Sequence, residues 1–163
     1  MNDANHLPPI DGRRAFARAV RRALECAADD RVRELCFADP DFVDWPLSDL
    51  GVLRALSRWA GPKRRLLMVA HHYDALALKH PRFVVWRRTW AHLIDCRATP
   101  ELDPGEVPSL LLGSLGASLQ RMETSRSHGR WLTNEEDWRT WREVVDAVLQ
   151  RSEEAFPAHT LGL

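Results

Sequence analysis

Hydrophobic positions recur along this chain with two periods, one typical of helices and one typical of strands. From Phe16 to Ala27 they return every three or four residues with arginines between them, which predicts an amphipathic helix. The same spacing predicts helices after Ser48, after Asp74 and after Thr133. Pro81 is expected to interrupt the third of these, because proline is tolerated in the first turn of a helix but not inside it.

Strand patterns fall between these helices. They cover residues 32–41, 64–73, 93–98, 109–115 and 117–123. The second segment contains Leu66–Ala70, a continuous apolar run of the kind found in a strand that is covered on both faces, so we place it at the centre of a sheet. The last two segments meet at Gly116 and predict a hairpin, followed by a polar loop over 124–130.

Strands separated by helices favour parallel pairing with helices on both faces of the sheet. The predicted fold class is therefore α/β, with a mixed and mostly parallel sheet, a closing antiparallel hairpin and a C-terminal helix. A length of 163 residues suits one domain. We predict a flexible N-terminal arm over 1–10, a single domain over 11–156 and a tail over 157–163.

Composition excludes some classes of protein. Hydrophobic residues make up 45% and charged residues 28%, which are ordinary values for a globular domain. The 23 basic and 23 acidic side chains balance, so no nucleic acid is expected as the main partner. The apolar runs are too short to span a membrane. The three cysteines lack the pairs and density of a secreted disulfide framework, which favours a cytoplasmic location.

The order of elements, together with the apolar run that leads into Gly116-Ala117-Ser118 and then a helix, resembles one half of the phospholipase D superfamily. The resemblance covers the layout of about Asp11 to Phe156. It implies a phospholipase D-like fold and, because small members of the family are single domains that pair, a homodimer.

Enzymes of that family carry His-x-Lys-x4-Asp on the strand that enters the hairpin. The histidine attacks phosphorus and the lysine holds phosphate oxygens. Superposing that motif on the apolar strand places Val107, Ser109 and Ser114 at the positions of the histidine, lysine and aspartate. Valine and serine supply neither an imidazole nitrogen nor a cation, so the resemblance implies a domain that has lost this activity.

His71 and His72 end the predicted central strand, where ligands bind in open α/β sheets. Asp74 follows closely and could orient one imidazole, as a carboxylate does for a general base. An alternative function is therefore a small hydrolase or transferase that uses His71 or His72 with Asp74. The alternative without a function is that both histidines simply end the strand, with their hydrogen bonds satisfied within the protein.

The helix around Pro81 combines tryptophans with arginines. A surface of this kind would suit a protein partner or an anionic ligand. Its candidate residues are Arg82, Trp86, Arg87, Arg88 and Trp90. The plainer interpretation is that the aromatic residues are core and the arginines are solvated. A further alternative is binding of a phosphorylated ligand or nucleic acid by Arg14 and Arg18 together with Arg87 and Arg88, which requires these side chains to converge.

No motif names a substrate, a reaction or a cofactor. The aspartates at 39, 41, 44 and 49 lack the spacing of a calcium loop, so no metal is expected. The function remains unknown at this level. The leading hypothesis is a non-catalytic, phospholipase D-like cytoplasmic domain for binding or interaction, which forms a homodimer or binds a protein partner through the tryptophan-bearing helix.

Overall fold

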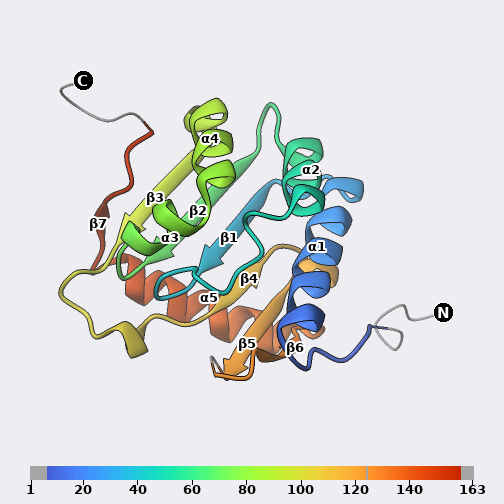
Figure 1. Cartoon of the computed structure of the whole chain (residues 1–163). Helices are drawn as coiled ribbons and strands as arrows, with labels where there is room; N and C mark the ends of the chain where they lie inside the picture. The colour runs from blue at the N-terminus through green and yellow to red at the C-terminus, as the bar shows by residue number, and fades with distance from the viewer. Residues whose placement is uncertain (1–6, 124, 159–163) are drawn as a thin grey trace.

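A computed structural model describes residues 7–123 and 125–158 of the chain. Its centre is a sheet of seven strands in the order β6-β5-β4-β1-β2-β3-β7 (Figure 1). The strands are β1 (Glu34–Ala38), β2 (Arg65–Ala70), β3 (Ile94–Ala98), β4 (Leu110–Leu112), β5 (Leu119–Glu123), β6 (His128–Trp131) and β7 (Glu153–Glu154). The α-helices are α1 (Arg13–Asp29), α2 (Leu50–Trp59), α3 (Asp74–Lys79), α4 (Pro81–Thr89) and α5 (Glu135–Leu149).

The sheet is mixed. Parallel pairing joins β1 to β2 and β2 to β3, whereas β1–β4, β4–β5, β5–β6 and β3–β7 are antiparallel. The α/β class predicted from the sequence is confirmed. The expectation of a mostly parallel sheet is not, because helical crossovers connect only β1, β2 and β3 in the described chain, while β4 to β6 follow one another as antiparallel neighbours.

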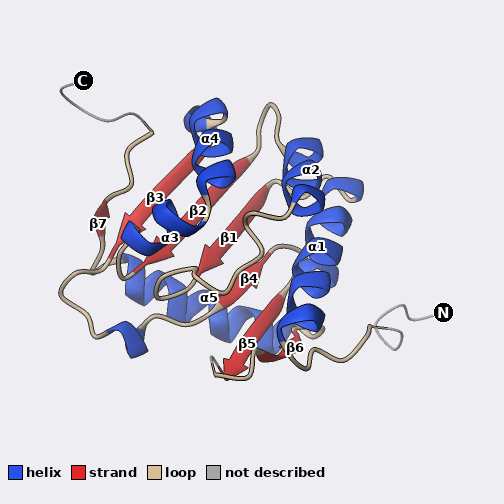
Figure 2. Cartoon of the chain, in the orientation of Figure 1, coloured by secondary structure: helices blue, strands red, loops and turns tan. Residues whose placement is uncertain are grey.

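Helices cover the two faces of the sheet unequally (Figures 1 and 2). The helices α1 to α4 form a layer on one face, and α5 lies alone on the other. The larger core fills the space under the four-helix layer and contains the cluster Phe16, Phe37, Phe42 and Trp45, whose rings meet at centroid distances of 5.0–5.8 Å. A smaller core lies under α5 and includes Val145 and Val148.

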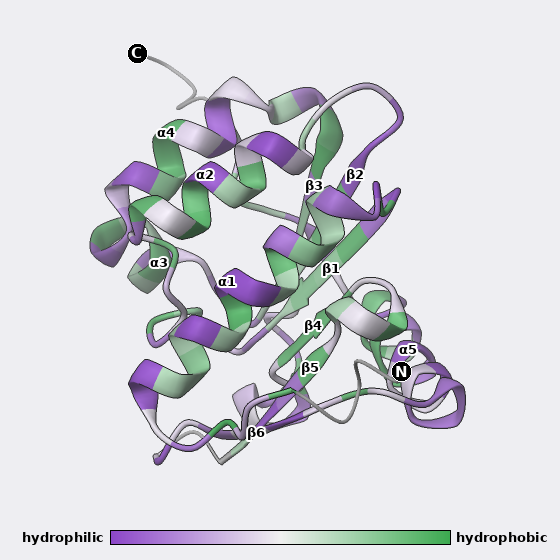
Figure 3. Ribbon diagram, turned by 90° about the vertical axis from the view of Figure 1, so that its right-hand side faces the viewer, coloured by the Kyte–Doolittle hydropathy of each residue, from purple (hydrophilic) through white to green (hydrophobic). Residues whose placement is uncertain are grey.

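Hydrophobic residues follow this two-sided arrangement (Figure 3). In β1, Leu35 and Phe37 belong to the larger core, whereas Cys36 and Ala38 belong to the smaller one. Successive side chains of a strand point to opposite faces, so an unbroken apolar run marks a strand that is covered on both sides. This explains why the apolar runs of the sequence located the strands correctly.

Pro81 separates α3 from α4, as predicted. The junction residue His80 is buried, and its Nε2 lies 3.0 Å from the carbonyl oxygen of Phe42. Its Nδ1 lies 2.6 Å from Oγ of Ser48. Burial lowers the pKa of His80, which favours the neutral ring. The histidine thus connects the helix junction to the loop that follows β1.

The hairpin of β4 and β5 is confirmed, but the polar loop predicted over 124–130 contains part of a further strand. In β6, His128 and Arg130 are exposed, while Gly129 and Trp131 are partly covered. An edge strand of this kind is held mainly by backbone hydrogen bonds, so it needs little hydrophobic sequence. The missing apolar alternation is the reason that the sequence did not reveal it.

The outer edge of β6 is covered by residues from the predicted N-terminal arm. Ile10 is buried and forms an antiparallel bridge with Gly129, and the indole nitrogen of Trp131 donates to the carbonyl oxygen of Pro8. Residues 1–6 of the arm, and residues 159–163 of the predicted tail, lie outside the described residues. None of the described helices combines the length and the apolar composition that a membrane crossing requires.

Gly129 lies where Ile10 approaches β6, and we expect it to be needed for this contact. A Cβ at Gly129 would stand 2.6 Å from the carbonyl oxygen of Gln120 and 3.1 Å from Cγ2 of Ile10. Gly129→Ala should therefore reduce the free energy of unfolding by about 1–3 kcal/mol in urea denaturation. Gly105→Ala is the matched control, because a Cβ there meets no atom within 4 Å. Equal stability of the two variants would contradict this account of the edge.

Candidate functional site

His71 and His72 lie at the carboxyl end of β2, as the sequence indicated. His71 is half-buried, with its Nδ1 3.0 Å from the carbonyl oxygen of Thr99, and His72 is exposed. Asp74 is exposed in the first turn of α3, and no hydrogen bond or ion pair joins it to either ring among the described contacts. None of the four pockets described for the chain is lined by these three residues. Among the described contacts and pockets, nothing therefore joins these residues into a relay beside a substrate cavity.

The positions matched to the phospholipase D motif lie in separate environments. Val107 is buried in the small core under α5. Ser109 is buried before β4 and accepts a hydrogen bond at Oγ from Nε of Arg121, at 3.2 Å. Ser114 lies beyond the other end of β4, where its Oγ is buried without a hydrogen-bond partner. The three side chains do not converge on one site.

Arg121 of β5 forms a buried ion pair that the sequence did not suggest. Its side chain is 3% exposed, and its Nη2 lies 3.1 Å from Oδ1 of the fully buried Asp39. Its Nη1 lies 3.2 Å from Oδ2 of Asp44. The guanidinium carbon lies 5.6 Å from the ring centroid of Phe16, which adds a cation–π contact.

The carboxylate of Asp39 is also saturated by backbone donors. Its Oδ2 accepts from the amide of Asp41 at 3.1 Å and from the amide of Phe42 at 2.7 Å. Each polar group of the pair therefore has a partner within the protein, as a buried charge requires. Because all three nitrogens of Arg121 bond within the protein, we interpret this cluster as a structural contact that holds the loop after β1.

The tryptophans and arginines of α4 contact their own chain. Trp86 is buried and donates from its indole nitrogen to Oγ of Ser57, at 3.1 Å. Arg87 is buried as well, and the exposed Arg88 donates to the carbonyl oxygen of Ala158 at 3.2 Å. The hypothesis of a free Trp and Arg surface is therefore corrected for Trp86 and Arg87, whose side chains serve the interior.

The other two candidates on this helix are partly accessible. Arg82 is exposed and donates to the carbonyl oxygen of Ser48 at 3.3 Å, and Trp90 is half-buried. Arg14 and Arg18 are exposed on α1, which α2 separates from α4 in the helical layer (Figure 1). With Arg87 buried, the four arginines of the nucleic-acid alternative do not form a common surface.

The aspartates after β1 serve as turn and cap residues. Asp49 caps α2 by accepting from the amide of Val52 at 3.1 Å, and Asp41 accepts from the amide of Val43 at 3.0 Å. Within residues 7–123 and 125–158, no group of three or more His, Cys, Asp and Glu side chains is arranged to hold a metal ion. The local hydrogen bonds account for the acidic cluster.

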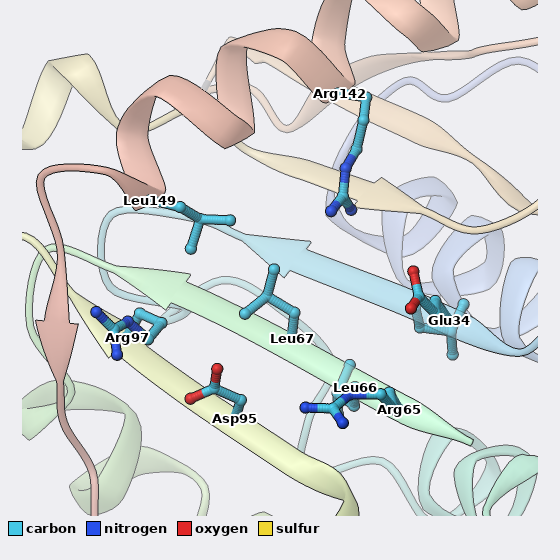
Figure 4. A pocket seen from close by; sticks show the side chains of 9 residues that line it. Glu34, Arg65, Leu66, Leu67, Asp95, Arg97, Arg142 and Leu149 are labelled. Carbon is cyan, nitrogen blue, oxygen red and sulfur yellow. The ribbon is translucent and has the colours of Figure 1, made fainter. Parts of the chain in front are cut away.

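A groove lined by arginines lies on the face of the sheet beside α5 (Figure 4). We call it the arginine groove; its volume is about 360 Å³. Its lining residues are Glu34, Leu35, Arg65, Leu66, Leu67, Asp95, Arg97, Arg142 and Leu149. Side chains from β1, β2, β3 and α5 thus surround one cavity.

The register of the parallel strands positions the floor of the groove. Leu67 pairs with Asp95 and Val69 with Arg97 across β2 and β3. Paired residues point to the same face, so the two charged residues of β3 stand beside the apolar residues of β2. The single helix α5 packs over the small core and leaves this half of the sheet accessible.

The groove carries both signs of charge with an excess of arginine. Arg142 extends from α5 toward the sheet (Figure 4), and its Nε lies 3.3 Å from Oδ1 of Asp146. Arg97 donates from Nε and Nη2 to Oγ and the carbonyl oxygen of Ser152, at 3.0 and 2.9 Å. Among the described ion pairs, none joins Glu34 or Asp95 to the arginines of the groove.

Sequence reasoning missed this site, although β3 contains a signal for it. Ile94, Cys96 and Ala98 alternate with Asp95 and Arg97. Such alternation indicates a strand with one face in the core and one face toward water. The expectation of helices on both faces of the central strands does not account for this polar face of β3.

The cysteines do not offer a nucleophile. Burial raises the pKa of Cys36 to about 12 and that of Cys96 to about 11. Cys26 is half-buried, and desolvation together with its contact to Asp30 raises its pKa to about 11. Since the thiolate is the reactive species, these thiols are inert near neutral pH.

Comparisons with models of protein families, with curated proteins and with solved structures found no match to this chain.

We expect the ion pair of Arg121 to dominate the stability of the fold. Arg121→Met removes the cation and leaves the fully buried carboxylate of Asp39 uncompensated. The free energy of unfolding in urea should fall by about 3–5 kcal/mol. The matched control is Arg130→Met on β6, where the arginine is 44% exposed and its Nη1 lies 3.6 Å from Oδ2 of Asp137. Loss of an exposed pair should change stability by less than about 1 kcal/mol. Similar losses in both variants would show that Arg121 has no special role.

Proposed function

We propose that this protein is a non-catalytic binding domain whose arginine groove takes a ligand with an anionic group next to an apolar part. The observation that carries the proposal is that Arg65 of β2, Arg97 of β3 and Arg142 of α5 all line one cavity. Guanidinium groups bind carboxylates and phosphates through paired hydrogen bonds. Leu67 and Leu149 supply an apolar surface for the rest of the ligand.

The position of the groove supports this proposal. Its arginines stand on strands and on a helix of fifteen residues, which fixes their backbone before a ligand arrives. Arg97 is oriented further by its two hydrogen bonds to Ser152. The carboxylates of Glu34 and Asp95 restrict the site to ligands that keep negative charge away from them, and so contribute to selectivity.

The absence of catalysis is part of the proposal. The lost motif positions Val107, Ser109 and Ser114 are dispersed, and His71 and His72 do not line the groove. A general base or nucleophile needs to reach the reacting atom within hydrogen-bond distance. None of the residues that line the groove is a histidine, cysteine or serine, and we assign its two carboxylates, Glu34 and Asp95, to selectivity rather than to general-base catalysis.

The finer expectations from the sequence also belong to this proposal. We propose a phospholipase D-like, cytoplasmic domain, supported by the order of its elements and its closing hairpin. In the alternatives of a hydrolase at His71 or His72 and of a nucleic-acid site on α1 and α4, the candidate residues do not line a described pocket together.

We expect phenyl phosphate to bind in the groove. Isothermal titration calorimetry should show that Arg142→Ala weakens its binding about tenfold, because the variant removes one charged donor from the site. Arg139→Ala is the matched control, since Arg139 lies on the same helix, is exposed and forms a comparable pair with Glu135. It should bind phenyl phosphate as the wild type does, and no phenol should be released on prolonged incubation.

Two results would contradict the proposal. The first is an equal effect of Arg139→Ala and Arg142→Ala, which would reduce the interaction to general surface charge. The second is hydrolysis of phenyl phosphate by the wild type that Arg142→Ala abolishes, which would make the groove an active site.

Formation of a homodimer is a separate expectation. Because Trp86 is buried, other residues of the helical layer would have to form the contact. Leu78 at the end of α3 is 86% exposed, which is high for a large apolar side chain. If the layer mediates a homodimer, Leu78→Asp should convert the dimer to a monomer in sedimentation velocity. Leu115→Asp, on the turn between β4 and β5, should leave the dimer intact. A monomeric wild type at high concentration would refute the expectation.

A further inference from the structure

The segment after α5 crosses the edge of the sheet and then covers part of the helical layer. It pairs with β3 through β7, and the amide of Ala155 donates to the carbonyl oxygen of Cys96 at 3.0 Å. Phe156 then turns with a positive φ of 49°. This conformation is rare for a residue other than glycine and is unfavourable for a bulky side chain. We call residues 153–158 the C-terminal strap.

Phe156 fills an aromatic site on the protein. Its ring stacks on Tyr73 with centroids 5.0 Å apart and an interplanar angle of 8°. The guanidinium carbon of Arg87 lies 5.9 Å from the same ring centroid. Tyr73 is held in place by its hydroxyl, which donates to the carbonyl oxygen of Arg97 at 2.9 Å. The hydrogen bond to Arg97 therefore fixes the orientation of the Tyr73 ring against which Phe156 stacks.

Arg87 is a buried cation without a counter-charge among the described residues. Only 6% of the residue is exposed, and its Nη2 donates to the carbonyl oxygen of Phe156 at 3.3 Å. Its Nε and Nη1 are buried and have no hydrogen-bond partner. The neighbouring Cys96 has a pKa raised to about 11, so it does not supply a thiolate at neutral pH.

A carbonyl oxygen is a poor partner for such a group. Buried guanidinium groups are normally paired with carboxylates, and unpaired ones destabilise the protein. The end of α4 offers only the partial charge of its helix dipole. A carboxylate in place of the Phe156 carbonyl would satisfy Arg87 through paired, charge-assisted hydrogen bonds.

We propose that Tyr73, Arg87 and the edge of β3 form a binding site for a peptide that ends in an aromatic residue with a free α-carboxylate. The aromatic ring stacks on Tyr73, the carboxylate pairs with Arg87, and the preceding backbone adds to the sheet edge. The C-terminal strap occupies the same site within the chain. Because the chain continues from Phe156 to Pro157, the strap presents a peptide carbonyl to Arg87, whereas the ligand would present a terminal carboxylate.

The strap already shows two parts of this recognition, the pairing of its backbone with β3 and the stacking of Phe156 on Tyr73. Backbone addition to an edge strand supplies affinity that depends little on sequence, and capture of a terminal carboxylate supplies specificity. The site lies on the helical side of the sheet, where Tyr73 belongs to the larger core and Phe156 packs against it. It therefore lies on the opposite face from the arginine groove, and a failure of phenyl phosphate to bind in the groove would not exclude this peptide site.

The test uses the full-length chain with Phe156→Ala, which empties the aromatic site. Its ligand is the fluorescein-labelled peptide Ser-Glu-Glu-Ala-Phe, which repeats residues 152–156 and has a free carboxylate. Fluorescence anisotropy should show that this peptide binds about tenfold more tightly than its C-terminal amide. The wild type should bind the free acid more weakly than Phe156→Ala does, because the strap competes for the site.

Two further variants locate the effect. Arg87→Met, added to Phe156→Ala, should abolish the preference for the free acid over the amide, whereas Arg142→Ala in the same background should preserve it. Equal affinity for acid and amide, or a preference that survives Arg87→Met, would overturn the proposal. Circular dichroism checks that the variants fold. If Phe156→Ala does not fold, the wild type supplies the test: excess free acid should shift the amide NMR signals of Ala155 and Phe156, and unchanged signals would refute the site.

Discussion

The ion pair between Arg121 and Asp39 joins two parts of the chain that are far apart in sequence. Arg121 belongs to the antiparallel strands, and Asp39 directly follows β1, the first of the parallel strands. Through its second carboxylate oxygen, Asp39 fixes the start of the loop that carries Trp45 into the aromatic cluster. His80 binds the same loop from the helix junction. If β5 were not paired correctly, Arg121 and Asp39 would each be a buried charge without a partner. The position of the helical layer therefore depends on the correct pairing of β5.

The unequal covering of the sheet gives its faces different properties. Four helices and the C-terminal strap close one face, and the space beneath them is filled by aromatic and aliphatic side chains. On the other face α5 covers the smaller core, and the strands beyond it carry Asp95 and Arg97. Charged residues on those strands keep the open face soluble in water, and they also provide the polar groups of the groove. Because α5 is the only α-helix described on this face, the strands beside it stay accessible, and the candidate site lies on them.

Features set by local sequence could be predicted well. The helices, the central strands, the hairpin around Gly116 and the break at Pro81 follow from apolar spacing and from the chemistry of glycine and proline. Features set by tertiary contacts could not. Nothing near Arg121 in the sequence indicates Asp39, and the exposed or buried state of Trp86 and Arg87 depends on α2 and on the strap. The edge strand β6 escaped prediction because backbone pairing, rather than apolar residues, holds it in the sheet.

The short strand β7 has a consequence for how the chain is made. During synthesis β3 emerges long before residues 153 and 154, so its outer edge has no partner while the ribosome completes the hairpin and α5. An unpaired edge is a template for association between nascent chains. The two glutamates of β7 close this edge last and place negative charges on it. A nascent chain that has not yet reached β7 would therefore expose the edge of β3, a hazard that the equilibrium stability of the folded protein does not reveal.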